Sequence, residues 1–414
     1  MTIAAVEADS PLVDSQSQFS PILCIPCEIT SEIFQNCLPE SPEHDFPRPS
    51  IKCAPLQLSH VCCAWRELVV QTPHLWSKVL LSSTHVFEET SGPVFSADMA
   101  AHAEALQTWM RRASPLRLSV HLQYPTLPRF LGTLSGLHRI PPAFRVIVEN
   151  ATRWKAVRLS LPEGYLSLAL FITQEHVCKL ESLDINNTSI PISGPKDSIH
   201  MPTNVFVTTD TAETLSTLSV CAGFGYISRN RGSLERLRTV SLKCSTPGSC
   251  LHLLEHCPVL EDLTLSFYDL PDIRLFSNNP VTLPRLRNFR LSHTGNDEDG
   301  RSFLPLARGG DIGLCLDKLQ LPNLQEFYLW MTIVESARDE DPNLPWDYLS
   351  RLIERSNCSL SRLELRSPHL DNPSILESLR LSPELKYLGI PADEELERSV
   401  AHLLPGLEML RVLE

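Results

Sequence analysis

The sequence predicts an α/β protein in which a small three-helix module precedes a repeat solenoid, with a curved parallel sheet and helices on the convex side. Two observations support this. Short amphipathic segments with helix-start signals lie between residues 25 and 78. Farther along, one apolar pattern recurs about ten times. We predict four parts: a disordered leader (1–20), the helical module (21–81, with a Pro-rich insert at 39–55), a linker and helix (82–114), and the solenoid (115–414).

The helical module contains three helix starts. Pro26 occupies a position where helices tolerate proline, because its missing N–H would have no intrahelical partner. Ile25, Ile29 and Ile33 recur every four residues, and a third start follows at Thr72. Between them, one apolar stripe with i, i+3, i+4, i+7 spacing is formed by Leu58, Val61, Cys62, Trp65, Leu68 and Val69.

Three short helices bury too little surface to be stable alone, so their apolar faces should contact a partner chain or the neighbouring domain. These segments resemble the F-box family, in the form common in mushroom-forming fungi. The matching residues are Ile25-Pro26-Cys27-Glu28-Ile29, Ile33-Phe34, Leu58, Val61-Cys62, Trp65-Arg66, Leu68, Thr72-Pro73 and Leu75-Trp76. Ile25 replaces the usual leucine, and the insert at 39–55 is a second departure. An ordinary helical cap on a larger core is the alternative interpretation.

The resemblance implies a substrate-recognition subunit of an SCF-type ubiquitin ligase, in which the F-box binds a Skp-family adaptor and, through it, a cullin. Such a subunit catalyses nothing and acts by bringing a target protein close to the ubiquitin-charged enzyme. An F-box scaffold that binds partners without ubiquitination remains an alternative. Transferred residue by residue, the adaptor-facing set is Ile25, Pro26, Ile29, Ile33, Phe34, Leu58, Val61 and Trp65.

From Leu116 onward an apolar-x-x-apolar-x-apolar pattern repeats, with a degenerate first copy at Leu116-Leu118-Val120. Most of the spacings fit leucine-rich repeats, and the longer ones leave room for insertions. Each copy predicts a short strand, and stacked copies bury together the apolar face that one copy cannot bury alone. The central positions are Val157, Leu183, Leu218, Val240, Leu263, Phe289, Phe327, Leu363, Leu388 and Leu410. The stretch 257–265 resembles the irregular leucine-rich repeats that accompany F-boxes.

Two further segments have local signals. The insert at 39–55 contains five prolines, which exclude a helix and favour an extended, solvated loop. Residues 101–112 have high helix propensity and end in two arginines, which favour the C-terminal end of the helix dipole.

Composition excludes several classes of function. A net charge of -13 and no basic run argue against a nucleic-acid partner. No stretch approaches eighteen consecutive apolar residues, and the first residues do not form a signal peptide, so a membrane partner is not expected. Thirteen cysteines, an odd number, in a chain with no secretion signal predict free thiols in the cytoplasm, the nucleus or both.

The motifs for metal, nucleotide and acyl chemistry are weak or missing. Cys24 and Cys27 form a C-x-x-C pair, so a metalloenzyme or redox protein is the alternative interpretation of the N-terminal region. A second cluster is assigned to core packing: Cys244, Cys250, His252, His256 and Cys257. The sequence has no P-loop and no Gly-x-Ser-x-Gly elbow. We therefore expect no catalytic residue, no cofactor and no metal.

The concave side of the solenoid offers a binding surface instead. In each strand, the residues that flank the last two apolar positions point away from the core. Among the later repeats these are Asn288, Arg290, Glu326, Tyr328, Trp330, Arg362, Glu364, Arg366, Tyr387 and Arg411. Because aromatic and arginine side chains anchor interfaces, we select Arg290, Tyr328, Trp330 and Arg366 as the target-binding patch. Ordinary solvated cross-strand pairs are the alternative.

Overall fold

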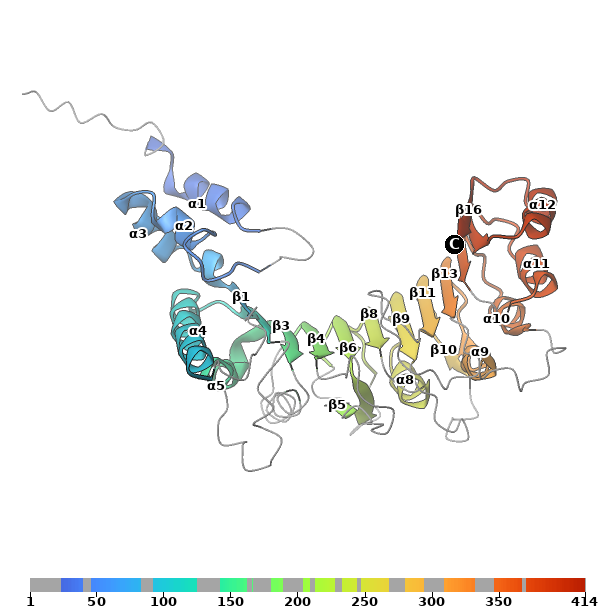
Figure 1. Cartoon of the computed structure of the whole chain (residues 1–414), viewed down its shortest axis with the longest axis horizontal. Helices are drawn as coiled ribbons and strands as arrows, with labels where there is room; N and C mark the ends of the chain where they lie inside the picture. The colour runs from blue at the N-terminus through green and yellow to red at the C-terminus, as the bar shows by residue number, and fades with distance from the viewer. Residues whose placement is uncertain are drawn as a thin grey trace, which may run out of the picture.

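The computed structural model forms an arc, with strands along its inner side, most helices along its outer side and the helical module at the N-terminal end (Figure 1). The predicted leader (1–20) lies outside the residues that the structure describes. Those residues are 24–39, 46–82, 92–124, 142–161, 166, 180–188, 204–208, 213–227, 233–243, 247–267, 280–293, 309–331, 346–366 and 370–413.

Twelve strands of the described residues form one sheet in which every pair is parallel. The predicted fold class is confirmed. Central apolar positions pair from strand to strand, as in Val157 with Leu183 and Leu388 with Leu410. In spatial order the strands are β1 (Lys78–Ser82), β2 (Leu118–Gln123), β3 (Trp154–Leu161), β4 (Ser182–Asn187), β6 (Thr217–Cys221), β8 (Thr239–Lys243), β9 (Asp262–Phe267), β11 (Asn288–His293), β13 (Glu326–Met331), β14 (Arg362–Arg366), β15 (Tyr387–Pro391) and β16 (Met409–Leu413).

Helices cover the outer face of this sheet, and leucines between the two layers form a continuous core. Two additional parallel pairs flank the main sheet: β5 (Asn204–Thr208) with β7 (Gly223–Ile227), and β10 (Val281–Thr282) with β12 (Leu319–Gln320). Among the described residues, no helix combines the length and apolar character that a membrane crossing requires. Outside the helical module, the described residues form the helices α4 (Gly92–Arg112), α5 (Pro142–Glu149), η5 (Ala151–Arg153), α8 (Pro247–Leu254), α9 (Gly309–Asp317), α10 (Tyr348–Ser356), α11 (Asn372–Arg380) and α12 (Glu394–Leu403).

The helical module contains α1 (Cys27–Asn36), α2 (Leu56–Ser59), α3 (Cys63–Gln71) and the short 3-10 helix η2 (Pro73–Trp76). Its chain continues directly into β1, which pairs with β2 and starts the sheet. The sheet therefore begins inside the range 21–81 that the sequence assigns to the helical module.

The Trp76-x-x-Val79-x-Leu81 segment explains this start, because it has the same apolar pattern as the later repeats. Trp154, at the first position of its own repeat, donates its indole N–H to the Ile147 carbonyl at 3.1 Å. Trp76 donates in the same way to the carbonyl seven residues before it, that of Val69, at 2.8 Å. The end of the helical module thus has the form of a first repeat.

The described part of the Pro-rich insert packs against the solenoid, which corrects the expectation of a solvated loop. Pro47 is buried, and its carbonyl accepts a hydrogen bond of 2.9 Å from the backbone N–H of Leu80 in β1. Phe46 contacts the ring of His121 in β2 edge-on, with ring centroids 5.8 Å apart. The insert therefore covers part of the free edge of β1, which would otherwise expose unpaired backbone groups.

Candidate docking surfaces

The interior of the helical module is packed around Phe34. Its side chain is 1% exposed and meets the Trp65 ring edge-on, with centroids 4.8 Å apart. The Ser31 and Thr72 hydroxyls lie 3.4 Å apart, and Thr72 donates to the Leu68 carbonyl at 2.7 Å. These contacts join α1, α3 and the start of η2. Phe34 and Trp65 therefore stabilise the module itself, and Phe34 is not available to a partner in this conformation.

The opposite side of α1 exposes its apolar residues. Ile29 is 49% exposed and Ile33 46%, and they lie one helical turn apart. Ile25 and Pro26, just before the helix, are also exposed. Val61, between α2 and α3, is 59% exposed. The structure thus divides the eight predicted adaptor residues into an exposed group, the half-buried Leu58 and Trp65, and the buried Phe34.

Two exposed apolar residues of the helical module were missed by the sequence interpretation. Ile51 lies in the Pro-rich insert, where no periodic pattern marks it, and it is the most exposed of the large hydrophobic side chains described. Val70 sits on α3 beside the buried Val69, and its position on the helix is the only signal that could have identified it.

The concave side of the last strands carries a layer of arginine and aromatic side chains. Strand pairing places Arg290 of β11 beside Tyr328 of β13, which lies beside Glu364 of β14. The Arg290 guanidinium is 5.0 Å from the Tyr328 ring centroid, and the guanidinium of Arg362 is 5.3 Å from the same ring. The Tyr328 hydroxyl donates to Glu326 at 2.8 Å. Tyr328 is therefore held between two cations and its orientation is fixed.

The next row of this surface contains Trp330 and Arg366. The Arg366 guanidinium is 5.3 Å from the Trp330 ring, and its Nε lies 3.7 Å from a Glu364 carboxylate oxygen. Trp330 remains 40% exposed. The four residues predicted for the target patch thus lie on three adjacent strands, β11, β13 and β14.

The same layer continues beyond the four selected residues. The Arg362 guanidinium is 3.9 Å from the Tyr387 ring, and a side-chain hydrogen bond with Tyr387 raises the pKa of Arg411. Burial is the first cause that raises the pKa of Tyr328, followed by its hydrogen bond to Glu326, so this phenol stays protonated at neutral pH. The patch therefore offers positive charge and aromatic area together.

The two cysteine clusters differ in burial. Cys24 and Cys27 are both exposed, and in the described part of the chain they do not belong to a group arranged to hold a metal. Cys257 is buried, its thiol donates to the Leu253 carbonyl at 3.3 Å, and burial raises its pKa to about 12. The core-packing interpretation holds for Cys250 and Cys257, but it is wrong for His252, whose side chain is exposed.

Comparison with known proteins gives weak but consistent matches. No family model matches the chain. Two curated proteins, each named F-box/LRR-repeat protein 21, from Bos taurus and Ovis aries, are 22% identical over 316 residues, which cover 75% of this chain and 63% of each relative. The match thus spans less than two thirds of these relatives' length. A solved structure from Bacteroides fragilis is 14% identical, with a TM-score of 0.35, covering 79% of this chain and 84% of that chain, which is too loose to bear on the fold. The sequence matches support an F-box/LRR-repeat protein.

Proposed function

We propose that this chain is a substrate-recognition subunit of an SCF-type ubiquitin ligase. Its helical module would bind a Skp-family adaptor and, through it, a cullin, while the concave face of the solenoid would bind a target protein. The observation that carries the proposal is the exposed apolar side of α1 on a module whose interior is already filled by Phe34 and Trp65. Apolar side chains that remain exposed beside a completed core indicate a protein interface.

The adaptor surface consists of Ile25, Pro26, Ile29, Ile33 and Val61. All five are exposed, and they come from α1, the residues before it and the α2–α3 connection. Leu58 and Trp65 are half-buried and pack against the core, so they hold the exposed residues of this surface in position. Phe34 contributes by fixing α1 in place. The resemblance to the F-box form of mushroom-forming fungi belongs to the same proposal and rests on the matching residues.

The target surface consists of Arg290, Tyr328, Trp330 and Arg366, extended by Arg362, Tyr387 and Arg411. Of the described concave residues on β11 and β13–β16, four are arginines and two, Glu326 and Glu364, are acidic. This surface is therefore positive within a chain whose net charge is -13. A target segment with carboxylate and apolar side chains would suit it, because guanidinium groups pair with carboxylates and aromatic rings bury apolar area.

No catalytic residue or cofactor enters this function. The mechanism would be proximity, in which holding the target beside the ubiquitin-charged enzyme raises the effective concentration of its lysines. The cytoplasm, the nucleus or both are the proposed location, because thirteen cysteines, an odd number, suit a reducing environment.

Co-purification of the full chain with the Skp-like adaptor of the same organism tests the proposal. Ile29→Asp places a charge in the centre of the proposed interface and should weaken adaptor binding at least about tenfold, because an unpaired carboxylate would be desolvated there. Ile227→Asp is the matched control, since Ile227 is 43% exposed on β7, and β5, the strand that pairs with β7, lies away from the helical module (Figure 1). Circular dichroism should show that both variants fold.

Stoichiometric adaptor capture by the parent chain and Ile227→Asp, but not by Ile29→Asp, would support the docking module. Equal capture by all three would overturn the proposed surface, and no capture by the parent chain would remove the ligase function. Adaptor capture without ubiquitination of a partner bound through Trp330 would instead favour the scaffold alternative.

A further inference from the structure

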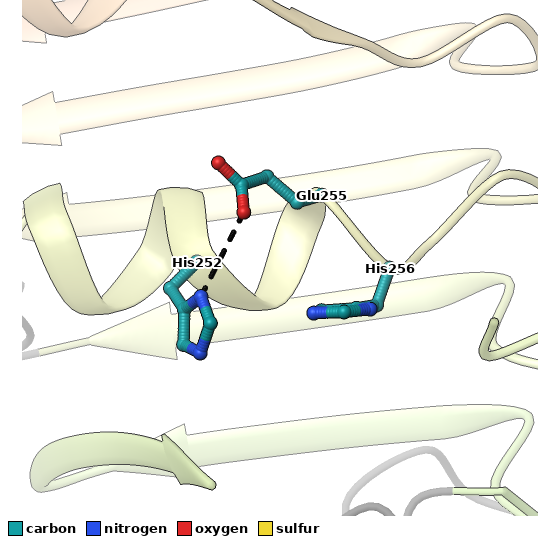
Figure 2. A group of neighbouring side chains, drawn as sticks. All are labelled: His252, Glu255 and His256. Carbon is teal, nitrogen blue, oxygen red and sulfur yellow. Dashed lines mark ion pairs between the residues drawn. The ribbon is translucent and has the colours of Figure 1, made fainter. Parts of the chain in front are cut away.

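Three side chains with metal-binding atoms gather at the end of α8. His252, Glu255 and His256 follow i, i+3, i+4 spacing, so they project from one side of the helix and of the turn after it. Their ligand atoms all lie within 4.8 Å of one another, and Nδ1 of His252 is 3.7 Å from a Glu255 carboxylate oxygen. Figure 2 shows the His256 ring extending back toward His252. His252 and Glu255 are exposed, so an ion can reach them from solvent.

The surroundings hold these side chains in place. Tyr226 of β7 packs against both imidazoles, with ring centroids 5.6 Å from His252 and 5.4 Å from His256. The backbone carbonyl of His256 accepts a hydrogen bond of 2.7 Å from the N–H of Leu234. The next residue, Cys257, is anchored in the core. Both histidines are therefore constrained by a neighbouring strand and by a fixed backbone, which lowers the entropy cost of binding an ion.

We infer that His252, Glu255 and His256 form a binding site for one divalent transition-metal ion of the zinc class, with water completing the coordination. Two imidazoles and one carboxylate suit Zn²⁺, Cu²⁺ and Ni²⁺ better than Mg²⁺ or Ca²⁺, which prefer oxygen ligands throughout. Ligands at 2.0–2.1 Å from a tetrahedral Zn²⁺ lie about 3.4 Å apart. The ligand atoms are at most 4.8 Å apart, so reaching that spacing requires small rotations of the exposed His252 and Glu255 side chains toward the half-buried His256.

The site is separate from the proposed docking surfaces. The helix α8 lies on the outer side of the arc, whereas α1 lies at the N-terminal end, and β11 and β13, two of the strands that carry the arginine–aromatic patch, line the inner side (Figure 1). Failure of adaptor binding would therefore leave this inference untouched, and the reverse also holds.

Competition for Zn²⁺ between the full chain and a chromophoric chelator tests the site. The parent chain should bind one equivalent of Zn²⁺. His252→Gln and His256→Gln should each lower the affinity for Zn²⁺ at least about tenfold, because each removes one of three protein ligands. His402→Gln is the matched control, since His402 is an exposed histidine at the end of α12. If His256→Gln fails to fold, His252→Gln, at an exposed helical position, still decides the result.

Titration with Co²⁺ separates this site from the exposed thiols of Cys24 and Cys27. The expected spectrum contains only weak d–d bands, because no thiolate is bound, and these bands should disappear in His252→Gln. Equal Zn²⁺ affinity in the parent chain and both histidine variants would overturn the site. A thiolate-to-metal charge-transfer band that persists in the variants would also overturn it, since the metal would then belong to cysteines.

Discussion

Replacing His121 with glutamine tests whether this imidazole is buried and neutral beneath the Pro-rich insert, at the N-terminal end of the concave face. His121 lies on β2, is 8% exposed and is covered by Phe46 from the Pro-rich insert. Burial first, and then the positive charges of Arg158 and Arg48, together lower its pKa from 6.5 to about 4. Arg158 is the paired residue on the adjacent strand β3.

The direction in which folding stability changes with pH follows from the number of protons bound in each state. Between pH 6.5 and about 4 the unfolded chain holds a proton on this histidine and the folded chain does not. The contribution of His121 to the free energy of unfolding is therefore fully present above pH 6.5, and it falls as the pH drops through this window. Integration from pH 7.5 to pH 5 gives a loss of about 2 kcal/mol from His121 alone.

Urea denaturation at the two pH values, followed by tryptophan fluorescence, measures this loss. The parent chain should lose about 2 kcal/mol more stability between pH 7.5 and pH 5 than His121→Gln, which has no group titrating in that range at this position. His402→Gln is the control for removing an exposed histidine elsewhere in the solenoid. Identical pH dependence in the parent chain and His121→Gln would refute the assignment of a buried, neutral imidazole.

Three further changes probe the packing of the solenoid. Gly313→Ala should lower stability by about 1–3 kcal/mol in thermal denaturation, because the new Cβ would overlap the Tyr348 ring where α9 packs on α10; an unchanged melting temperature would contradict this packing. Phe327→Ala should cost about 3–5 kcal/mol in urea denaturation, since its ring is fully buried between strands and helices, and a loss below 1 kcal/mol would place it outside the core. Asp371→Ala should cost about 1 kcal/mol by the same assay, because it removes the N-cap acceptor 2.8 Å from the Ser374 N–H; Asp371→Asn should recover most of it.

The repeated strands could be predicted because their apolar spacing is local in the sequence. Each central residue, such as Leu263 or Phe289, lies two positions before another apolar residue, and pairing in register follows from stacking equal units. Strand β1 was missed although Trp76, Val79 and Leu81 carry the same pattern, because the segment also completes the motif of the helical module.

Exposure could not be predicted from periodicity. The stripe that contains Ile29 and Ile33 shows that α1 has an apolar side, but only the packed neighbours decide that Phe34 fills the core and the isoleucines face solvent. The same applies to α8. The spacing of His252 and His256 is visible in the sequence, whereas their contact with Tyr226 depends on β7, which is far from them in the chain.

Trp76 joins the helical module to the solenoid through buried contacts with α4, and this fixes how the two proposed docking surfaces are placed. Trp76 is fully buried, its indole meets that of Trp109 in α4 edge-on with centroids 4.7 Å apart, and Arg112 lies 4.3 Å above its ring. The Trp109 N–H donates to the Lys78 carbonyl at the start of β1. The helical module and the solenoid therefore share one core rather than being joined by a flexible linker. A shared core holds the adaptor surface and the target surface at a fixed separation, so a bound target would be presented in a defined orientation without ordering a linker on assembly.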